Sequence, residues 1–193
     1  MSSFDKRAKD WDKNSKRVQT ARKVAKAIKE CVQKKGLDIL DFGCGTGLVS
    51  YELTDIANSI TGIDTAPKMV EMFNAKSTSS TIQAHCKDID AIEPTFDLIV
   101  SSMTFHHIED IHEIIGKLYA KLKPGGIICI ADLVTEDGTF HSDNTGVHHF
   151  GFDPERLAKK FEELGFRKLC LNVVHTIEKH KNFDVFLLCM QKG

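Results

Sequence analysis

A glycine-rich loop that follows an apolar run constrains this chain more than any other part of its sequence. Residues 37–48 read LDILDFGCGTGL, so Gly43, Gly45 and Gly47 alternate directly after the run. A short apolar run of this kind predicts a buried strand of parallel sheet, and the glycines predict a tight turn into a helix. Glycine adopts positive φ without strain and leaves space for a ligand against the backbone. The pattern predicts a nucleotide-like ligand at the end of a strand.

Spacing and nearby acids narrow the choice of ligand. The dinucleotide fingerprint G-x-G-x-x-G seats a pyrophosphate, whereas the spacing here is one residue shorter. Asp41 precedes the first glycine by two positions and would repel a pyrophosphate, but it suits the sulfonium and ammonium of S-adenosylmethionine. A second apolar run ends at Asp64, where a carboxylate can accept hydrogen bonds from both ribose hydroxyls.

Further motifs follow in order along the chain. They are ILDFGCGTG, GID at Asp64, KDID at Asp88, FDLIVSSMTFHHI and LKPGGIICIADL. This series resembles the class I S-adenosylmethionine-dependent methyltransferases, most of all the small-molecule branch typified by ubiquinone/menaquinone biosynthesis, over about residues 37–133. The resemblance implies an α/β fold: a Rossmann-like, doubly wound, mostly parallel seven-stranded sheet with an antiparallel last strand and helices on both faces.

The resemblance also implies site residues. Those expected to bind the cofactor, with S-adenosyl-L-homocysteine as its product, are Asp41, Phe42, Gly43, Cys44, Gly45, Gly47, Asp64, Thr65, Met69, Asp88, Ile89, Ser101, Met103 and His106. Two of these have an alternative: Met69 is equally read as a core methionine, and Asp90 competes with Asp88 for the adenine amino group. No catalytic residue is identified, and the candidates for a general base are His106, His148 and His149.

The 193 residues are expected to form a single methyltransferase domain. Residues 1–36 are interpreted as an N-terminal lid segment and helix, 37–133 as the cofactor-binding core, and 134–193 as an acceptor loop, a helix and a closing hairpin. Residues 1–13 are expected to be loosely structured, with Trp11 either in a lid or pinning the tail. Residues 1–14, 101–108 and 135–151 are expected to form the acceptor pocket.

The composition of the chain limits where the protein is expected to be located and which partners it is expected to bind. Neither a membrane span nor a secretory signal is evident, and the six cysteines include no C-x-x-C pair, so a cytoplasmic protein with free thiols is expected. Residues 1–35 hold 12 Lys and Arg against 4 Asp and Glu, whereas the rest of the chain holds 14 against 23. This basic start is read as a solvated helix face rather than as a surface for nucleic acid or membrane, because an apolar stripe alternates with the charges.

Nine histidines raise the question of a metal ion. They cluster at 106–112 and 141–149, where converging His, Asp and Glu would suit Zn²⁺ or Mg²⁺. No helix carries two histidines at i and i+4, and no cysteine ligand set accompanies them. The sequence therefore predicts no metal site.

The expected activity is transfer of a methyl group from S-adenosylmethionine to a small-molecule acceptor by in-line displacement. Positioning alone can supply about 7–11 kcal/mol of such a reaction, and carbon, oxygen, nitrogen and sulfur acceptors all fit. The alternatives are a non-catalytic module that binds S-adenosylmethionine, an NAD-dependent oxidoreductase, and a nucleic-acid methyltransferase. The last is opposed by the absence of an N-P-P-Y-like tetrad at Ser101–Thr104.

Overall fold

A seven-stranded sheet forms the centre of the computed structural model of the chain. The structure describes residues 2–93 and 95–193, so Met1, with which the expected lid segment begins, lies outside the described residues. The strands are β1 (Leu37–Phe42), β2 (Ala57–Asp64), β3 (Ile82–Cys86), β4 (Phe96–Ser102), β5 (Leu122–Leu133), β6 (Phe166–Glu178) and β7 (Asn182–Lys192). The α-helices are α1 (Ser3–Arg7), α2 (Ser15–Val32), α3 (Leu48–Glu52), α4 (Pro67–Lys76), α5 (Ile111–Lys121) and α6 (Pro154–Glu163), and the 3₁₀ helices are η1 (Ala8–Lys13), η2 (Ile89–Ala91) and η3 (Phe105–His107).

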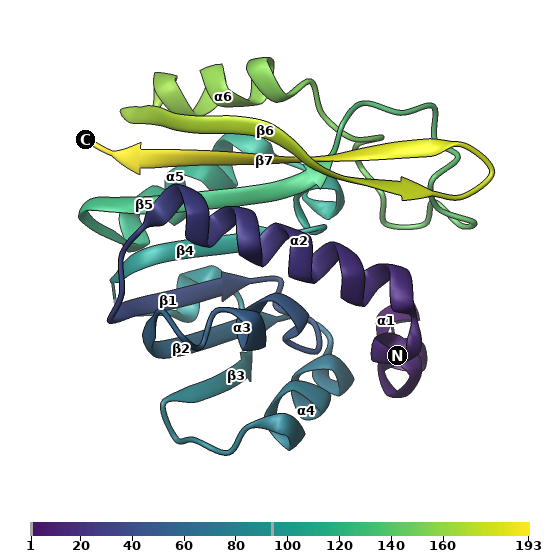
Figure 1. The fold of residues 1–193 in the computed structure, drawn as a ribbon, viewed down its shortest axis with the longest axis horizontal. Helices are drawn as coiled ribbons and strands as arrows, with labels where there is room; N and C mark the ends of the chain where they lie inside the picture. Colours follow the sequence, from purple (N-terminus) through teal and green to yellow (C-terminus); the bar gives the residue numbers. More distant parts are fainter. Residues whose placement is uncertain (1, 94) are drawn as a thin grey trace.

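The strand order is β3-β2-β1-β4-β5-β7-β6 (Figure 1). The first five strands run parallel, whereas β7 pairs antiparallel with both β5 and β6. This is the doubly wound sheet with an antiparallel last strand that the resemblance implied, so the expected fold class is confirmed. The order reverses between β1 and β4, and open α/β sheets bind their ligands at the carboxyl ends of strands beside such a point.

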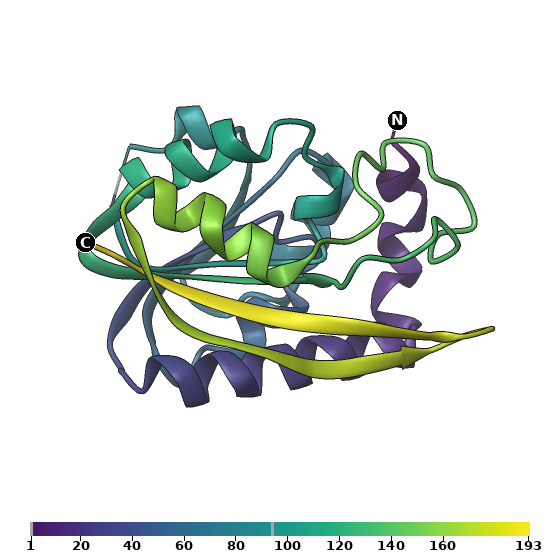
Figure 2. The same ribbon diagram turned by 90° about the horizontal axis from the view of Figure 1, so that it is seen from above.

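Helices cover both faces of the sheet. In Figure 2, α2 lies on one side of the sheet, and α5 and α6 lie on the other. One apolar core joins α2, α3 and α4 to the sheet through side chains such as Ile28, Leu53 and Phe73. The other core joins α5 and α6 to the opposite face through Ile115 and Phe161. Because most side chains of the central strands β1 and β4 are buried by one of these layers, the strands read as nearly continuous apolar runs.

Capping residues set the helix boundaries largely as expected. The Asn14 side chain caps α2 by accepting from the backbone N–H groups of Lys16 and Arg17. Asp153 caps α6 in the same way, as its sequence predicts, with Pro154 in the first turn. The sequence Thr65-Ala66-Pro67 predicts Thr65 as the cap of α4, and this prediction is wrong: Ala66 occupies the cap position, without a side-chain cap.

Other boundaries differ from the expectations. Residues 1–13 are not loosely structured, because a capping box between Ser2 and Asp5 starts α1 and η1 continues it. The sequence Pro124-Gly-Gly predicts a turn before a strand that starts at Ile127, but β5 begins at Leu122, and the glycines fall within an irregularity in its pairing with β4. In the part of the chain that the structure describes, no helix has the length and apolar character needed to cross a membrane.

Candidate cofactor and acceptor site

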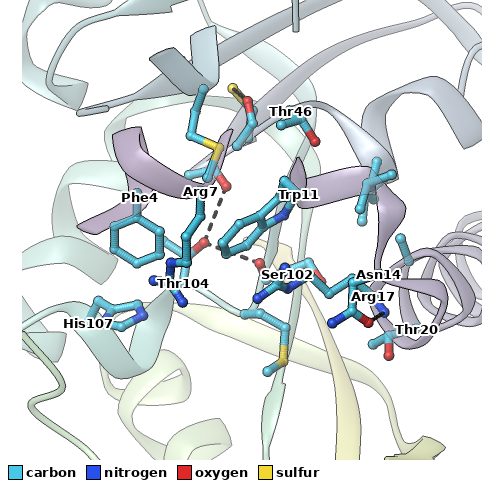
Figure 3. A pocket seen from close by; sticks show the side chains of 18 of the residues that line it. Phe4, Arg7, Trp11, Asn14, Arg17, Thr20, Thr46, Ser102, Thr104 and His107 are labelled. Atoms are coloured by element: carbon cyan, nitrogen blue, oxygen red, sulfur yellow. Dashed lines mark hydrogen bonds between the residues drawn. The ribbon is translucent and has the colours of Figure 1, made fainter. Parts of the chain in front are cut away.

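A cavity of about 350 Å³ opens at the carboxyl ends of β1, β2 and β4. The glycine loop and Asp64 form one wall, called here the glycine-loop wall. His106, His107 and His141 form another, called here the histidine wall. Figure 3 shows side chains from α1, η1 and α2 over the same space, with Arg7 between the rings of Phe4 and Trp11. Cofactor sites usually occupy about 300–1,000 Å³, so the cavity is of the right size.

The glycines of the loop have distinct structural roles. A Cβ on Gly43 would lie 2.3 Å from the Oγ1 of Thr104, so this position closes the loop against the segment after β4. A Cβ on Gly45 would meet nothing within 4 Å, which leaves its backbone open to the cavity. Gly47 has φ +84° and precedes α3 as its N-cap, where a Cβ would overlap the ring of Phe73. All three glycines have positive φ, as the loop pattern predicts.

Asp41 is a buried carboxylate beneath the loop. It is 3% exposed, and one carboxylate oxygen accepts a 2.6 Å hydrogen bond from the Oγ of Ser50. Burial raises the pKa of Asp41 to about 7, the hydrogen bond from Ser50 opposes this rise, and the charge of Asp64 adds to it. A cationic group in the cavity would favour the ionised form of this acid.

Asp64 ends β2 and lines the cavity from the neighbouring strand. Its two oxygens accept hydrogen bonds of 2.8 Å from the backbone N–H groups of Gly45 and Ala66. Burial raises its pKa, and these backbone bonds lower it in part. Each carboxylate oxygen has a second acceptor site, so the side chain is oriented for two donors of a ligand.

A second cavity of about 270 Å³ adjoins the first, and both are lined by Gly43, Asp64 and Thr65. Phe42, Asp88 and Ile89 line the second cavity only. Asp90 lines neither, because its carboxylate forms an ion pair of 2.8 Å with Lys117 on α5. Of the two acids that the sequence left open, Asp88 therefore faces the space where a ligand would fit.

The N-terminal segment covers the first cavity. Asp12 accepts a hydrogen bond of 2.5 Å from the Oγ1 of Thr46 in the glycine loop and forms an ion pair of 2.7 Å with Lys76 on α4. Trp11 lies under the guanidinium of Arg17, with 3.8 Å between its ring centroid and the Cζ atom. Trp11 therefore both lines the cavity and pins the segment, so the two readings of this residue are compatible.

His106 and Asp132 form a buried pair on the histidine wall. The Nδ1 of His106 lies 2.7 Å from the Oδ1 of Asp132, and its backbone N–H donates to the other oxygen at 3.2 Å. A carboxylate only accepts, so Nδ1 carries the proton and Nε2 keeps its lone pair. That Nε2 is buried and has no hydrogen-bond partner.

His148 and His149 lie outside this wall. His148 is exposed, and the Nε2–H of His149 donates to the backbone oxygen of Ile108 at 2.9 Å. Both backbone N–H groups donate to the carbonyl of His106, so the two residues support the segment that carries His106. Of the three candidate bases, only His106 lines the cavity.

The structure brings most of the expected cofactor-binding residues together. Those that line the first cavity are Asp41, Gly43, Cys44, Gly45, Asp64, Thr65, Met69, Met103 and His106. Ser101 and Gly47 line neither cavity, because the Ser101 hydroxyl turns back to the carbonyl of Phe42 at 2.8 Å and Gly47 faces Phe73. Met69 is also buried in a small cluster with Ala8 and Ala66, beneath the N-terminal segment.

Sequence reasoning missed several lining residues. Arg17, Thr20 and Lys179 reach the cavity from α2 and from the loop between β6 and β7. Asp132 was also missed, although an acid at the end of a buried strand in the motif IADL was a usable signal. Its importance depends on pairing with His106, which no local pattern shows.

The residues fit S-adenosylmethionine better than a dinucleotide. Asp41 is buried and Asp64 is half-buried, so two acids stand beside the loop, an environment that opposes phosphate and favours a cation. Asp64 on the glycine-loop wall offers a carboxylate to the ribose hydroxyls of S-adenosylmethionine. The open backbone at Gly45 leaves room for the amino-acid part of the same cofactor. Asp88 and Ile89 stand at the adjoining cavity, where an adenine would be expected.

Comparisons with known proteins agree with this geometry. Residues 40–130 match the family model described as a methyltransferase domain. An uncharacterized methyltransferase of Schizosaccharomyces pombe is 36% identical over 151 residues, which are 67% of this chain and 53% of that protein. A malonyl-[acyl-carrier protein] O-methyltransferase of Acetivibrio thermocellus is 32% identical over 167 residues, or 83% of this chain and 56% of the relative.

A solved structure shows the same fold. The N-methyltransferase NodS of Bradyrhizobium japonicum WM9, in complex with S-adenosyl-L-homocysteine, gives a TM-score of 0.72 at 18% identity, covering 94% of this chain and 91% of NodS. The chain spans about half the length of the two curated relatives it matches. Together, the motifs, the sheet order and these matches lead to one conclusion: the chain belongs to the class I S-adenosylmethionine-dependent methyltransferases.

Proposed function

We propose that this chain is an enzyme that methylates an oxygen of a small, negatively charged acceptor. One observation carries the proposal: the first cavity brings two features together. Asp41 and Asp64 lie at its glycine-loop wall, and His106 on its histidine wall presents an oriented Nε2 without a hydrogen-bond partner. When bound, S-adenosylmethionine supplies a methyl group on a positively charged sulfur, which is a good leaving group. The relative from Acetivibrio thermocellus is named an O-methyltransferase, which supports oxygen as the acceptor atom.

The residues of this chain contribute position and proton transfer. The glycine-loop wall and the cover formed by α1 and η1 would hold the cofactor and exclude water from the cavity. His106 would take the proton of an acceptor hydroxyl at Nε2, while Asp132 holds the imidazole in the required tautomer and stabilises its charged form. Most of the rate enhancement would come from placing the acceptor in line with the methyl group.

The cations at the cavity indicate the charge of the acceptor. Arg7, Lys16, Arg17 and Lys179 all line it. Burial lowers the pKa of Lys179, and so do the positive charges of Arg17 and Lys16. Burial and the charge of Arg7 lower the pKa of Arg17 in the same direction. A bound carboxylate or phosphate would relieve this mutual repulsion, which favours an anionic acceptor.

Calorimetric titration with S-adenosyl-L-homocysteine, with NAD as the parallel ligand, tests the cofactor part. Asp64→Ala is expected to weaken S-adenosyl-L-homocysteine at least about 10-fold, because two hydrogen bonds to a charged acceptor are lost. Asp55→Ala, which removes an exposed carboxylate on another loop, is the matched control and should leave affinity unchanged. Binding of NAD in place of S-adenosyl-L-homocysteine would instead support an oxidoreductase.

Transfer of labelled methyl to a panel of small hydroxy acids and their uncharged esters tests the acceptor part. Lys179→Gln is expected to raise KM for the acids without changing cofactor affinity, and Lys159→Gln on the exposed side of α6 is the control. Equal turnover of acids and esters would contradict an anionic acceptor. Cofactor binding without turnover of any acceptor would favour the non-catalytic module.

A further inference from the structure

Three histidine side chains meet on the histidine wall of the cavity. His106 and His107 come from η3, directly after β4, whereas His141 comes from the long connection between β5 and α6. Each ring offers one nitrogen, and these three nitrogens all lie within 4.8 Å of one another. The rings are neighbours, with centroid distances of 4.2, 5.0 and 5.7 Å. The sequence separates the third histidine from the others by more than thirty positions, so only the fold brings them together.

Second hydrogen bonds orient two of the rings. The Nδ1–H of His106 donates to Asp132, and the Nδ1–H of His107 donates to the backbone oxygen of Gly146, both at 2.7 Å. Each bond leaves the lone pair on Nε2. A carboxylate or carbonyl behind an imidazole is the usual support of a metal-ligating histidine, because it fixes the ring and raises the basicity of the other nitrogen.

The nitrogens at the centre of the cluster lack partners. The Nε2 atoms of His106 and His141 are buried without a hydrogen-bond partner, the only two side-chain atoms of this kind among the described residues. Unpartnered buried nitrogens are costly unless a ligand satisfies them.

We propose that His106, His107 and His141 bind one divalent transition-metal ion of the zinc class, with its open position facing the acceptor. Tetrahedral zinc with ligand distances of about 2.0–2.1 Å holds its nitrogens about 3.3 Å apart, so the three nitrogens, now within 4.8 Å of one another, would draw closer on binding. Three protein ligands and one open position are typical of catalytic rather than structural zinc. This departs from the sequence expectation of no metal site, since that expectation considered only local spacing.

The metal site stands on its own geometry, and only its role rests on the proposed function. An acceptor hydroxyl bound at the open position would give its proton to solvent water more readily, because the ion would stabilise the resulting alkoxide. With the ion bound, the Nε2 lone pair of His106 is donated to the metal, so the ion replaces this nitrogen as the group that activates the acceptor. Asp132 would then orient His106 as a metal ligand rather than as a general base.

A cysteine cluster elsewhere in the chain offers a competing site. Cys31, Cys170 and Cys189 also place their sulfur atoms within 4.8 Å of one another, between α2 and the strands β6 and β7. Thiolates bind zinc strongly, so metal binding alone would not identify the histidines. Cobalt(II) distinguishes the two sites, because thiolate ligands add charge-transfer bands in the near ultraviolet whereas histidine ligands give only the weaker visible bands.

The test is titration of the chelator-treated full chain with Co²⁺, followed by displacement with Zn²⁺. One equivalent of Co²⁺ is expected to give visible bands without thiolate bands. His141→Ala and, separately, His107→Ala should weaken Co²⁺ at least about 100-fold, since even loss of a supporting group costs 10–100-fold. His112→Ala, on the exposed side of α5, and Cys31→Ser are the matched controls and should keep wild-type affinity.

Absence of Co²⁺ binding would overturn the proposal, and so would thiolate bands that persist in His141→Ala and disappear in Cys31→Ser. Titration with S-adenosyl-L-homocysteine, run on the same preparations, separates this outcome from failure of the proposed function. Far-ultraviolet circular dichroism and thermal unfolding of His141→Ala, compared with the wild type, show that the variant is folded. If the wild type does not bind S-adenosyl-L-homocysteine, the cofactor assignment is refuted, whereas the metal result is unaffected.

Discussion

Replacing Asp41 with Asn tests whether a buried acid beneath the glycine loop carries an uncompensated charge. Burial raises the pKa of this carboxyl to about 7, whereas an unfolded Asp titrates near 3.8. The folded protein therefore binds more protons than the unfolded chain between these two values, and stability must fall as the pH rises through that window. The amide introduced by Asp41→Asn does not titrate, so the variant lacks this part of the pH dependence.

The two pKa values set the size of the effect. Between about pH 5.5 and pH 8, ionisation of Asp41 is expected to remove about 2 kcal/mol of the free energy of unfolding of the wild type. Below about pH 3 the term vanishes, because both states are protonated. Above about pH 8 it is constant, because both are ionised.

Urea unfolding of the wild type and Asp41→Asn at the two pH values measures this term. Subtracting the pH dependence of the variant from that of the wild type cancels every other titrating group, including His107 and His141. A difference near zero would refute the reasoning, because it would mean that Asp41 titrates at its ordinary value despite its burial.

Proton release on ligand binding gives a second measurement of the raised pKa of Asp41. At pH 7 about half of Asp41 is protonated in the free protein, and a cationic ligand that lowers its pKa by two units or more should release about half a proton. Calorimetry of S-adenosyl-L-homocysteine binding in buffers with different ionisation enthalpies measures this release. Asp41→Asn should bind without it, and an equal release in the variant would assign the proton to another group.

Three further substitutions test the cover, the core and the loop. Asp12→Ala removes the contacts of this residue with Thr46 and Lys76, which help to hold the N-terminal segment over the cavity, and it should weaken S-adenosyl-L-homocysteine several-fold while changing the free energy of unfolding by less than about 1 kcal/mol; unchanged affinity would show that these two contacts do not hold a cover over the ligand. Phe105→Ala empties a fully buried site and should cost about 3–5 kcal/mol in urea unfolding, whereas a loss below about 1 kcal/mol would show that the site collapses. Gly47→Ala should destabilise more than Gly36→Ala, because both have positive φ but only the former would place a Cβ 2.5 Å from the ring of Phe73; equal losses by thermal unfolding would leave backbone strain as the only cause.

The sheet and the glycine-loop wall were predictable because their signals are local. A buried parallel strand reads as an apolar run, and the residue that ends it points to the binding edge of the sheet. Asp41, Asp64 and Asp88 were all found in this way. The same logic found the segment of His106, since it directly follows β4.

The histidine wall was not predictable, because its contacts depend on pairing between distant strands. His106 and Asp132 are 26 positions apart and meet because β4 and β5 align Ser102 with Ala131. His141 joins them from a connection without regular structure, whose path no periodicity describes. Local spacing rules for metal ligands apply to ligands on one helix or one turn, so they reject a site of this kind.

The N-terminal cover was missed for a different physical reason. α1 and η1 are five and six residues long, too short for a periodic apolar pattern to emerge. What holds them in place is tertiary: Asp5 accepts from the backbone N–H of Lys68, and Asp12 contacts the glycine loop. From the sequence alone, a segment with many charges and few apolar residues is therefore predicted to be a loose tail.

Basic residues near the N-terminus have two kinds of surroundings. Arg22 and Lys29 on α2 form ion pairs with Glu52 and Asp55 of the body, as expected for a solvated helix face. Arg17 instead turns toward the cavity, where it stacks on Trp11. We therefore expect the charge of Arg17 to act on a small acceptor inside the cavity, with a weak dependence of acceptor binding on salt.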